Sequence, residues 1–209
     1  MVQKSYRSWL IVLALLGATV DQVSKYKIFR WLNQDNSAHF ASDAGTREIV
    51  PEWFRLHAQY TDQMAGESWL RNWSSDRMPR VNHGALFGLG NQHEREANRV
   101  FALISVLAGL AIVGWSFRRT TSSDRLLCAA LGLILAGTLG NLYDRVVFGG
   151  VRDFLYFYKI EWPVFNIADC CLVCGAFLLL AQAFLAQPVV APAPAVRETV
   201  PSPEAVQVQ

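Results

Sequence analysis

Three long stretches without a single charged residue constrain this chain more than any other feature. They comprise residues 100–117, 126–143 and 170–196. A helix that crosses a membrane needs about 20 mostly apolar residues, within a range of about 17–25. The sequence therefore predicts three membrane-spanning helices, at about 99–117, 126–144 and 164–186.

A fourth span is predicted near the start of the chain, although only residues 8–20 are uncharged there. The apolar pattern continues to give a span at about 8–32, in which Asp21 and Lys25 stand four residues apart on one helical face. A basic N-terminus before an apolar core also resembles a cleaved signal peptide, but residues 18–20 make a poor cleavage site. The predicted fold class is an all-α membrane protein with four transmembrane helices.

Basic residues set the predicted orientation of these helices. They lie before the first span and between the second and third, as Lys4, Arg7, Arg118, Arg119 and Arg125. Because short basic flanks stay in the cytoplasm, both termini are expected there, with residues 33–98 and 145–163 outside. The formal net charge of +2 is spread without a basic stripe, so no nucleic-acid partner is expected.

The larger outer segment, 33–98, is long enough to fold on its own. Residues 49–60 alternate as a strand does, and residues 80–88 are typical of a second strand or a turn. Residues 61–80 are polar and show no clear period. The sequence therefore predicts a small extracytoplasmic β-sheet cradle.

The sequence predicts one integral membrane domain, 1–186, followed by a tail, 187–209. The tail holds five of the eight prolines, together with much alanine and valine. This composition predicts a disordered cytoplasmic tail that is dispensable for activity.

All four cysteines fall inside predicted spans rather than in the outer loops. They are Cys128, Cys170, Cys171 and Cys174. A disulfide framework would place them in the loops, and no histidine cluster accompanies them for metal binding. They are expected to be small apolar packing residues.

Every unusual polar residue maps to the outer side of the membrane. This set comprises Asp21, Lys25, Asn82, Asn141, Asp144, Arg145, Asp153, Asn166 and Asp169. The cytoplasmic side carries only the ordinary basic flanks. Because charged groups at membrane depth are costly and mark functional sites, one polar site at the outer boundary explains the set.

Asp153 and Asp169 are the candidates for chemistry within this set. Asp153 follows Gly149-Gly150, and Asp169 opens the last span with Asn166 three residues before it. Two close carboxylates in a poorly solvated site cannot both ionise easily, so one holds a proton while the other is a base. Such a pair can activate water and protonate a leaving amine. The alternative is two unrelated capping aspartates.

The other members of the set favour structural roles. Asp144 is expected to pair with Arg145 or a neighbour, and Asp21 with Lys25. Asn82 either supports a glycine-rich turn or touches substrate backbone. The small residues Gly137 and Gly140 predict a close approach between helices.

Six short motifs follow one another from the first span to the last. They are Asp21-x-x-x-Lys25, Val50-Pro51-x-x-Phe54, Asn82-x-Gly84-Ala85-x-Phe87-Gly88, Gly137-x-x-Gly140-Asn141-Leu142-x-Asp144-Arg145, Val151-x-Asp153-Phe154 and Phe165-Asn166-Ile167-Ala168-Asp169. Each motif alone is weak. Six in one order, over most of residues 9–186, resemble lipoprotein signal peptidase, also called signal peptidase II, a family of bacterial membrane aspartic peptidases.

This resemblance implies an aspartic endopeptidase that cuts prolipoproteins just before a lipobox cysteine already carrying diacylglycerol. The family's catalytic pair corresponds here to Asp153 and Asp169. Its supporting polar residues correspond to Asp21, Lys25, Asn82, Asn141, Arg145 and Asn166.

The resemblance also implies a setting for the reaction. The enzyme is expected in the bacterial cytoplasmic (inner) membrane with its active site at the outer face, without a metal or organic cofactor. Its partners would be diacylglyceryl-modified prolipoproteins, membrane lipid and globomycin-type inhibitors, and we expect a monomer.

Two departures from the family pattern affect the outer loop. Residues 61–80 resemble an insertion relative to the family, between the outer strand and the Asn82 motif, and Leu86 stands where the family favours a small residue.

Two other functions fit a small membrane protein: a transporter or proton channel, and a non-enzymatic assembly factor. The inner halves of the spans are almost wholly apolar, which disfavours a transport path.

Overall fold

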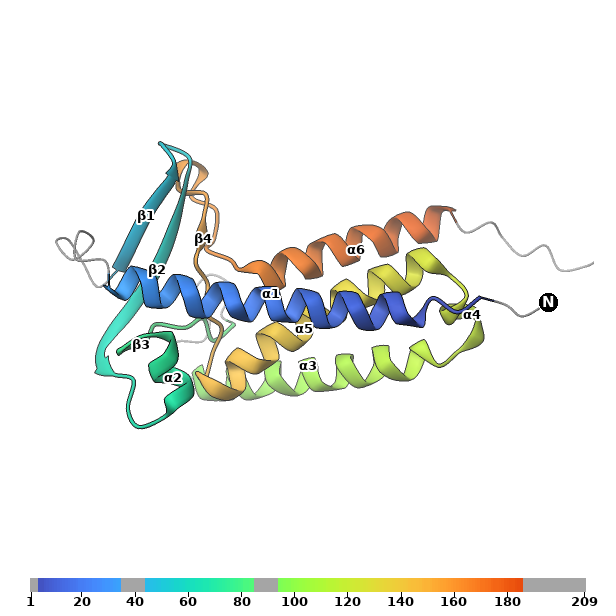
Figure 1. Cartoon of the computed structure of the whole chain (residues 1–209), viewed down its shortest axis with the longest axis horizontal. Helices are drawn as coiled ribbons and strands as arrows, with labels where there is room; N and C mark the ends of the chain where they lie inside the picture. Colours follow the sequence, from blue (N-terminus) through green and yellow to red (C-terminus); the bar gives the residue numbers. More distant parts are fainter. Residues whose placement is uncertain (1–3, 35–43, 85–93, 186–209) are drawn as a thin grey trace, which may run out of the picture.

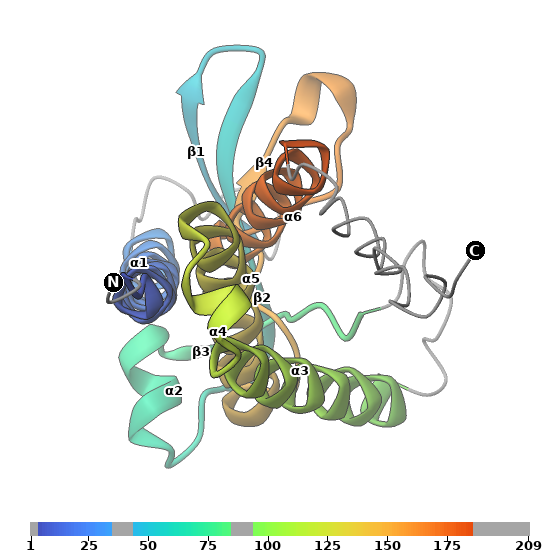
Figure 2. The same ribbon diagram turned by 90° about the vertical axis from the view of Figure 1, so that its right-hand side faces the viewer.

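Four long helices run side by side along the length of the molecule (Figure 1). The structure is a computed structural model that describes residues 4–34, 44–84 and 94–185. The four helices are α1 (Arg7–Gln34), α3 (Glu94–Ser116), α5 (Arg125–Val147) and α6 (Ile167–Leu185). Seen along the bundle, α5 lies between the other three and contacts each of them (Figure 2). The predicted tail, 187–209, lies outside the described residues.

Hydropathy confirms the predicted fold class, a mostly helical membrane protein. Helices α3, α5 and α6 are long and apolar enough to cross a membrane. Helix α1 has 28 residues and is about 42 Å long, which also suffices to cross. Its outward side chains include exposed Val12, Leu15 and Leu16, which suit contact with lipid rather than water. That α1 is the fourth span stays a prediction.

The last span begins later than predicted, at Ile167 instead of about 164. The backbone N–H of Phe165 donates to the Leu155 carbonyl, and the Leu155 N–H donates back to Phe165. This bridge holds the chain extended just before the helix. Helix α6 therefore begins only at Ile167, and Asp169 lies in its first turn.

A small antiparallel sheet covers one end of the bundle. Its strands are β1 (Ala44–Val50), β2 (Phe54–Met64), β3 (Arg77–Pro79) and β4 (Leu155–Tyr156). The order is β1-β2-β3, and β4 pairs with β2. The single strand predicted over 49–60 is wrong, because Pro51 follows β1 and Glu52 turns the chain with a φ of 62°. In residues 80–88, where a second strand or a turn was expected, Asn82 forms an isolated bridge with Val151, and residues 85–88 lie outside the described ranges.

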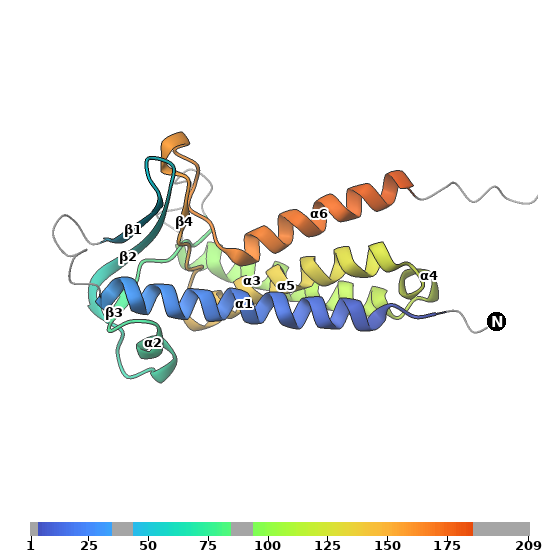
Figure 3. The same ribbon diagram turned by 45° about the horizontal axis from the view of Figure 1, so that its top comes forward.

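The segment 61–80, which showed no period in the sequence, contains regular structure. Strand β2 extends into it as far as Met64, and helix α2 (Trp69–Ser74) and β3 follow. Figure 3 shows α2 beside the sheet-bearing end of α1. The Arg71 side chain ties α2 to the end of α5 through a 2.8 Å bond from Nε to the Val147 carbonyl. Among the described residues there are also the short helix α4 (Arg119–Ser122) and the 3-10 helix η3 (Tyr158–Ile160).

Two apolar clusters hold the bundle and the sheet together. The first, at the end away from the sheet, contains Leu10, Ala14, Ile112, Cys128, Leu131 and Leu135. The second joins α1 to the sheet through Phe29, Leu32, Leu56, Ala58, Tyr60 and Phe154. None of the four cysteines forms a disulfide. The Cys128 thiol is fully buried and donates to the Thr121 carbonyl, as a packing residue would.

Helix α5 approaches its neighbours most closely at two glycines. A Cβ added at Gly137 would lie 2.3 Å from the Ala168 carbonyl oxygen, and one at Gly140 would lie 2.6 Å from Asp21 Oδ2. Both separations are far below van der Waals contact. The predicted close approach between helices is therefore confirmed: α5 packs closely against α6 at Gly137, and against both α1 and α6 at Gly140.

We expect Gly137→Ala to destabilise the protein by about 2 kcal/mol, because α6 must move away from α5 to admit the methyl group. Thermal unfolding of the purified protein in detergent measures the loss. Gly114→Ala on α3 is the control, since nothing lies within 4 Å of its added Cβ. Equal melting temperatures for the two variants would contradict this close packing.

Candidate active site

Asp153 and Asp169 reach the same site from two different segments. Asp153 follows the loop after α5, where Val151 is bridged to Asn82 by two backbone hydrogen bonds. Asp169 lies in the first turn of α6. Both side chains are half-buried, at the end of the bundle that carries the sheet.

Asn166 joins the two aspartates directly. Its side-chain Nδ2 donates to Asp153 Oδ1 at 2.7 Å, and its backbone N–H donates to Asp169 Oδ2 at 3.1 Å. In return, the Asp169 N–H donates to Asn166 Oδ1 at 3.1 Å, which caps the first turn of α6. One fully buried residue therefore holds both carboxylates in place.

Two more asparagines complete the donors around the pair. Asn82 Nδ2 donates to Asp153 Oδ2 at 3.0 Å, and Asn141 Nδ2 donates to Asp169 Oδ1 at 2.9 Å. Asn82 also supports its own turn, since its Oδ1 accepts from the Gly84 N–H. Asn82 therefore supports the turn, as one of the two predicted roles has it, and also contacts Asp153; its contact with substrate backbone stays a prediction.

A buried network of charged side chains supports this site. Lys25 Nζ lies 2.8 Å from Asp21 Oδ2, 3.3 Å from Asp144 Oδ2 and 3.3 Å from Asn141 Oδ1. The ammonium group donates hydrogen bonds to Asp21 and Asn141 and forms an ion pair with Asp144. The free oxygen of Asp21 accepts from the Ala168 N–H on α6 at 2.9 Å. Lys25 thus orients Asn141, and Asp21 fixes the start of α6.

Of the partners predicted for Asp144, which were Arg145 or a neighbour, the structure shows the neighbour Arg152. Its carboxylate accepts from the Arg152 side chain at 2.8 and 3.3 Å and from the Arg152 backbone N–H at 2.9 Å. Arg145 instead lies over the Phe101 ring, 5.0 Å from its centre, and donates to Asn98 Oδ1. Adjacent residues on a helix point 100° apart, which separates Asp144 from Arg145.

Arg145 nevertheless contributes its positive charge to the site. Its guanidinium interacts electrostatically with both Asp153 and Asp169. Asn98 on α3 holds it from the other side, with its Nδ2 donating to the Arg145 carbonyl at 3.1 Å. Arg145 is thus a cation facing the pair of carboxylates.

Arg152 is the main residue that the sequence reasoning missed. It is fully buried, lies directly before Asp153 and donates to Ser74 on α2 at 2.9 Å and to Gln22 on α1 at 2.9 Å. Its guanidinium also lies 3.8 Å from the centre of the Phe148 ring. An arginine beside a motif aspartate was a visible signal, but its partners are 8 to 130 residues away in the chain.

The surroundings of Asp153 favour its protonated form. Burial, followed by the negative charge of Asp169, raises the pKa of Asp153 to about 7, against the hydrogen bonds donated by Asn82 and Asn166. Asp153 therefore keeps its proton at pH values below about 7. The arrangement can supply an acid and a base side by side.

A cavity of about 300 Å³ opens beside Asp153 toward the sheet. It is lined by His57, Gln59, Arg80, Val81, Asn82, Asp153, Pro163 and Val164. Burial and the neighbouring Arg55 lower the pKa of His57, so its imidazole is neutral at pH 7. The cavity is large enough to admit an extended peptide segment to Asp153.

The residues that the structure describes contain no group of three or more His, Cys, Asp or Glu side chains placed to hold a metal ion. The acid–base pair is the chemistry that these side chains themselves supply.

Comparison with known proteins identifies the family of this chain. The family model described as signal peptidase (SPase) II matches residues 13–185. The lipoprotein signal peptidase of Rhodopirellula baltica is 34% identical over 186 residues, covering 82% of this chain and 70% of that protein. That of Pseudoalteromonas translucida is 47% identical over 85 residues, covering 40% of this chain and 50% of that protein. In that alignment the chain spans only half the length of its relative.

Solved structures share the fold. Two bacterial membrane enzyme structures superpose with TM-scores of 0.62 and 0.59, at 24% and 25% identity, and each covers 88% of this chain. The matches cover 92% and 97% of those two chains. Membership of a peptidase family overturns the transporter and assembly-factor alternatives. The chain therefore belongs to the signal peptidase II family, the multi-pass bacterial membrane aspartic endopeptidases that cleave signal peptides from prolipoproteins.

Proposed function

We propose that Asp153 and Asp169 are the catalytic residues of this peptidase, and that they share one proton. The single observation that carries this assignment is the bridge made by Asn166, which holds one oxygen of each carboxylate. The raised pKa of Asp153 makes it the resting acid, and Asp169 is then the base. Because the two groups are coupled, their titration belongs to the pair.

The reaction needs only these two groups and one water. Ionised Asp169 takes a proton from the water, whose oxygen attacks the carbonyl carbon before the substrate cysteine, while Asp153 gives its proton to the carbonyl oxygen. In the second step the diol returns that proton to Asp153, and the C–N bond breaks. Asp169 passes its proton to the departing amine, which restores both groups.

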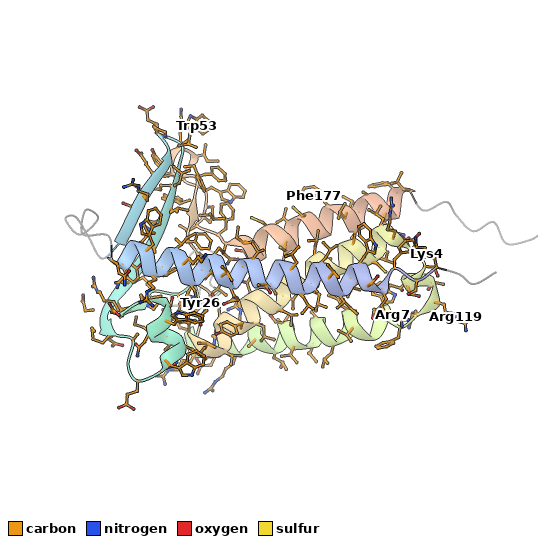
Figure 4. All side chains as sticks on the ribbon, viewed as in Figure 1. Lys4, Arg7, Tyr26, Trp53, Arg119 and Phe177 are labelled. Atoms are coloured by element: carbon orange, nitrogen blue, oxygen red, sulfur yellow. The ribbon has the colours of Figure 1, made fainter. Side chains whose placement is uncertain are left out.

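The substrate is a prolipoprotein whose cysteine already carries diacylglycerol. The site lies where the sheet meets the ends of the spans, so a lipid chain in the membrane would fix how deeply the cleavage point enters. Figure 4 places Lys4, Arg7 and Arg119 at one end of the bundle and Trp53 at the other. By the positive-inside rule the basic end is cytoplasmic, which puts the active site at the outer face of the inner membrane.

Incubation of the purified protein with a diacylglyceryl-modified precursor tests this function. Cleavage of the lipidated precursor, inhibition by a globomycin-type peptide and no cleavage of an unlipidated control are the expected results. Equal cleavage of both precursors would contradict the lipid requirement while leaving the peptidase assignment intact.

The proton on Asp153 predicts a particular pH profile. Cleavage should fall as pH rises through about 7, because Asp153 then loses the proton that the carbonyl oxygen needs. Asn82→Ala removes a donor that favours the ionised form, so the apparent pKa should rise by about one unit and activity should persist to higher pH. Single-turnover cleavage rates, measured at steps of about one pH unit over the range of about pH 5 to 9, give this shift in the apparent pKa.

Asn72→Ala is the control for this profile, since Asn72 lies on α2 and bonds to the Gly66 carbonyl instead. A profile for Asn82→Ala that moves to lower pH, or matches the control, would contradict the assigned proton.

A further inference from the structure

A second cavity, separate from the one beside Asp153, lies between α1 and α2. It has a volume of about 440 Å³ and is lined by Gln22, Val23, Tyr26, Lys27, Arg30, Trp73 and Tyr143. None of these residues lines the cavity beside Asp153. Tyr143 lies in the last turns of α5, so the cavity is level with the outer ends of the spans.

The walls of this cavity are aromatic and rigid. The Trp73 and Tyr26 rings are 5.4 Å apart at their centres, and the Tyr26 and Tyr143 hydroxyls are 2.7 Å apart. Trp69 and Trp73 remain 70% and 58% exposed on α2. Amphipathic aromatic rings exposed at this level are typical of the boundary between lipid tails and head groups.

Two cations stand at the mouth of the cavity. Lys27 and Arg30 lie three residues apart on α1, and both side chains are exposed. In the described ranges of the chain, neither forms an ion pair with a carboxylate. Glu67 borders only a neighbouring hollow that shares Arg30 and Trp73. The cavity therefore offers a net positive site to an anion.

An apolar stripe leads from these cations toward the cytoplasmic end of α1. It consists of Val12, Leu16, Val20 and Val23, which are 46–58% exposed. At 100° per residue, this stripe and the two cations fall within an arc of about 80° on the helix. The stripe is about 16 Å long, close to the ~15 Å depth of one leaflet's hydrocarbon layer.

We propose that this surface binds one anionic phospholipid of the outer leaflet. Its phosphate would lie between Lys27 and Arg30, its head group against Trp73 and Tyr26, and its acyl chains along the stripe from Val23. A free phosphate would match only the cations. A zwitterionic lipid would match the stripe and could place its phosphate near the cations, but its own ammonium group would be repelled by Lys27 and Arg30. The combination of both along one helical face selects the anionic lipid.

This lipid would contact the support of the active site. Gln22 lines the cavity and also accepts from Arg152 at 2.9 Å, and the Arg152 guanidinium lies 4.4 Å from the centre of the Tyr26 ring. The proposal rests on the outward orientation argued above but not on the identity of the catalytic residues. Its test therefore measures binding rather than cleavage.

Titration of the full chain in neutral detergent with phosphatidylglycerol, followed by thermal unfolding, gives an apparent dissociation constant. We expect phosphatidylglycerol to raise the melting temperature, and phosphatidylcholine or inorganic phosphate at the same concentration to raise it far less. Lys27→Gln/Arg30→Gln should weaken phosphatidylglycerol binding by about 30-fold, since each basic residue contributes about fivefold near an anionic head group.

Arg95→Gln/Arg99→Gln is the matched control, because it removes two charges from the outer end of a different helix, α3. Binding to this variant should change less than about threefold. Val23→Trp is a second probe that fills the cavity without changing charge, and it should also weaken binding.

Three results would overturn the proposal. The first is equal binding of phosphatidylglycerol and phosphatidylcholine. The second is an equal response to inorganic phosphate, which would indicate an anion site without a lipid. The third is equal loss of binding in the α1 and α3 double variants, which would indicate a general effect of charge.

Discussion

Asp153→Asn and Asp169→Asn should each lower the rate of prolipoprotein cleavage by at least about 10³-fold, in line with the contribution of a positioned acid or base. Asparagine keeps the shape and one of the two accepting oxygens of each carboxylate, but it can neither hold nor take the proton. Because each step of the proposed reaction uses both groups, the double variant should be scarcely slower than either single variant. Single-turnover cleavage of a lipidated precursor measures these rates.

Folding must be shown to survive in these variants. Asp153 and Asp169 are half-buried and accept hydrogen bonds from amides, so their loss of charge should leave the melting temperature close to that of the parent. Asp62→Asn is the control, since Asp62 is exposed on the sheet and pairs with Arg77. Cleavage within tenfold of the parent by either active-site variant would end the assignment of the pair.

Arg152→Met should have the largest effect on stability, lowering the free energy of unfolding by about 3–5 kcal/mol. The guanidinium is fully buried and neutralises Asp144, which keeps only Lys25 as a cationic partner after the substitution. Cleavage should also fall, because Arg152 fixes the backbone that leads into Asp153. Thermal unfolding in detergent and single-turnover cleavage measure the two effects.

Two further variants separate charge from packing in this network. Asp144→Asn added to Arg152→Met restores electrical neutrality, so the double variant should be more stable than Arg152→Met alone. Ser74→Ala removes one neutral acceptor of Arg152 and should cost only about 1 kcal/mol. A melting temperature for Arg152→Met equal to that of the parent would show that this buried cation does not hold the loop.

The structure also shows partners for the polar residues that their residue types alone do not predict. Asn166 bridges the two aspartates, Lys25 orients Asn141, and Asp21 accepts from the first turn of α6. Asp144 and Arg145 are neighbours in the chain yet serve different partners. The segment 61–80 contributes Ser74 to the network that supports the active site and Trp73 to the second cavity.

Hydrophobic length and residue type alone predicted the three apolar helices and singled out Asp153, Asp169 and Asn166 as candidate site residues, because an uncharged run of about 20 residues and a buried carboxylate each have few acceptable environments. Only the tertiary structure decided the partners. Arg152 reaches Ser74 and Gln22 across 78 and 130 residues of chain, and β1 is defined by its pairing with β2. Such contacts depend on how helices and strands pack, and local sequence carries no record of that geometry.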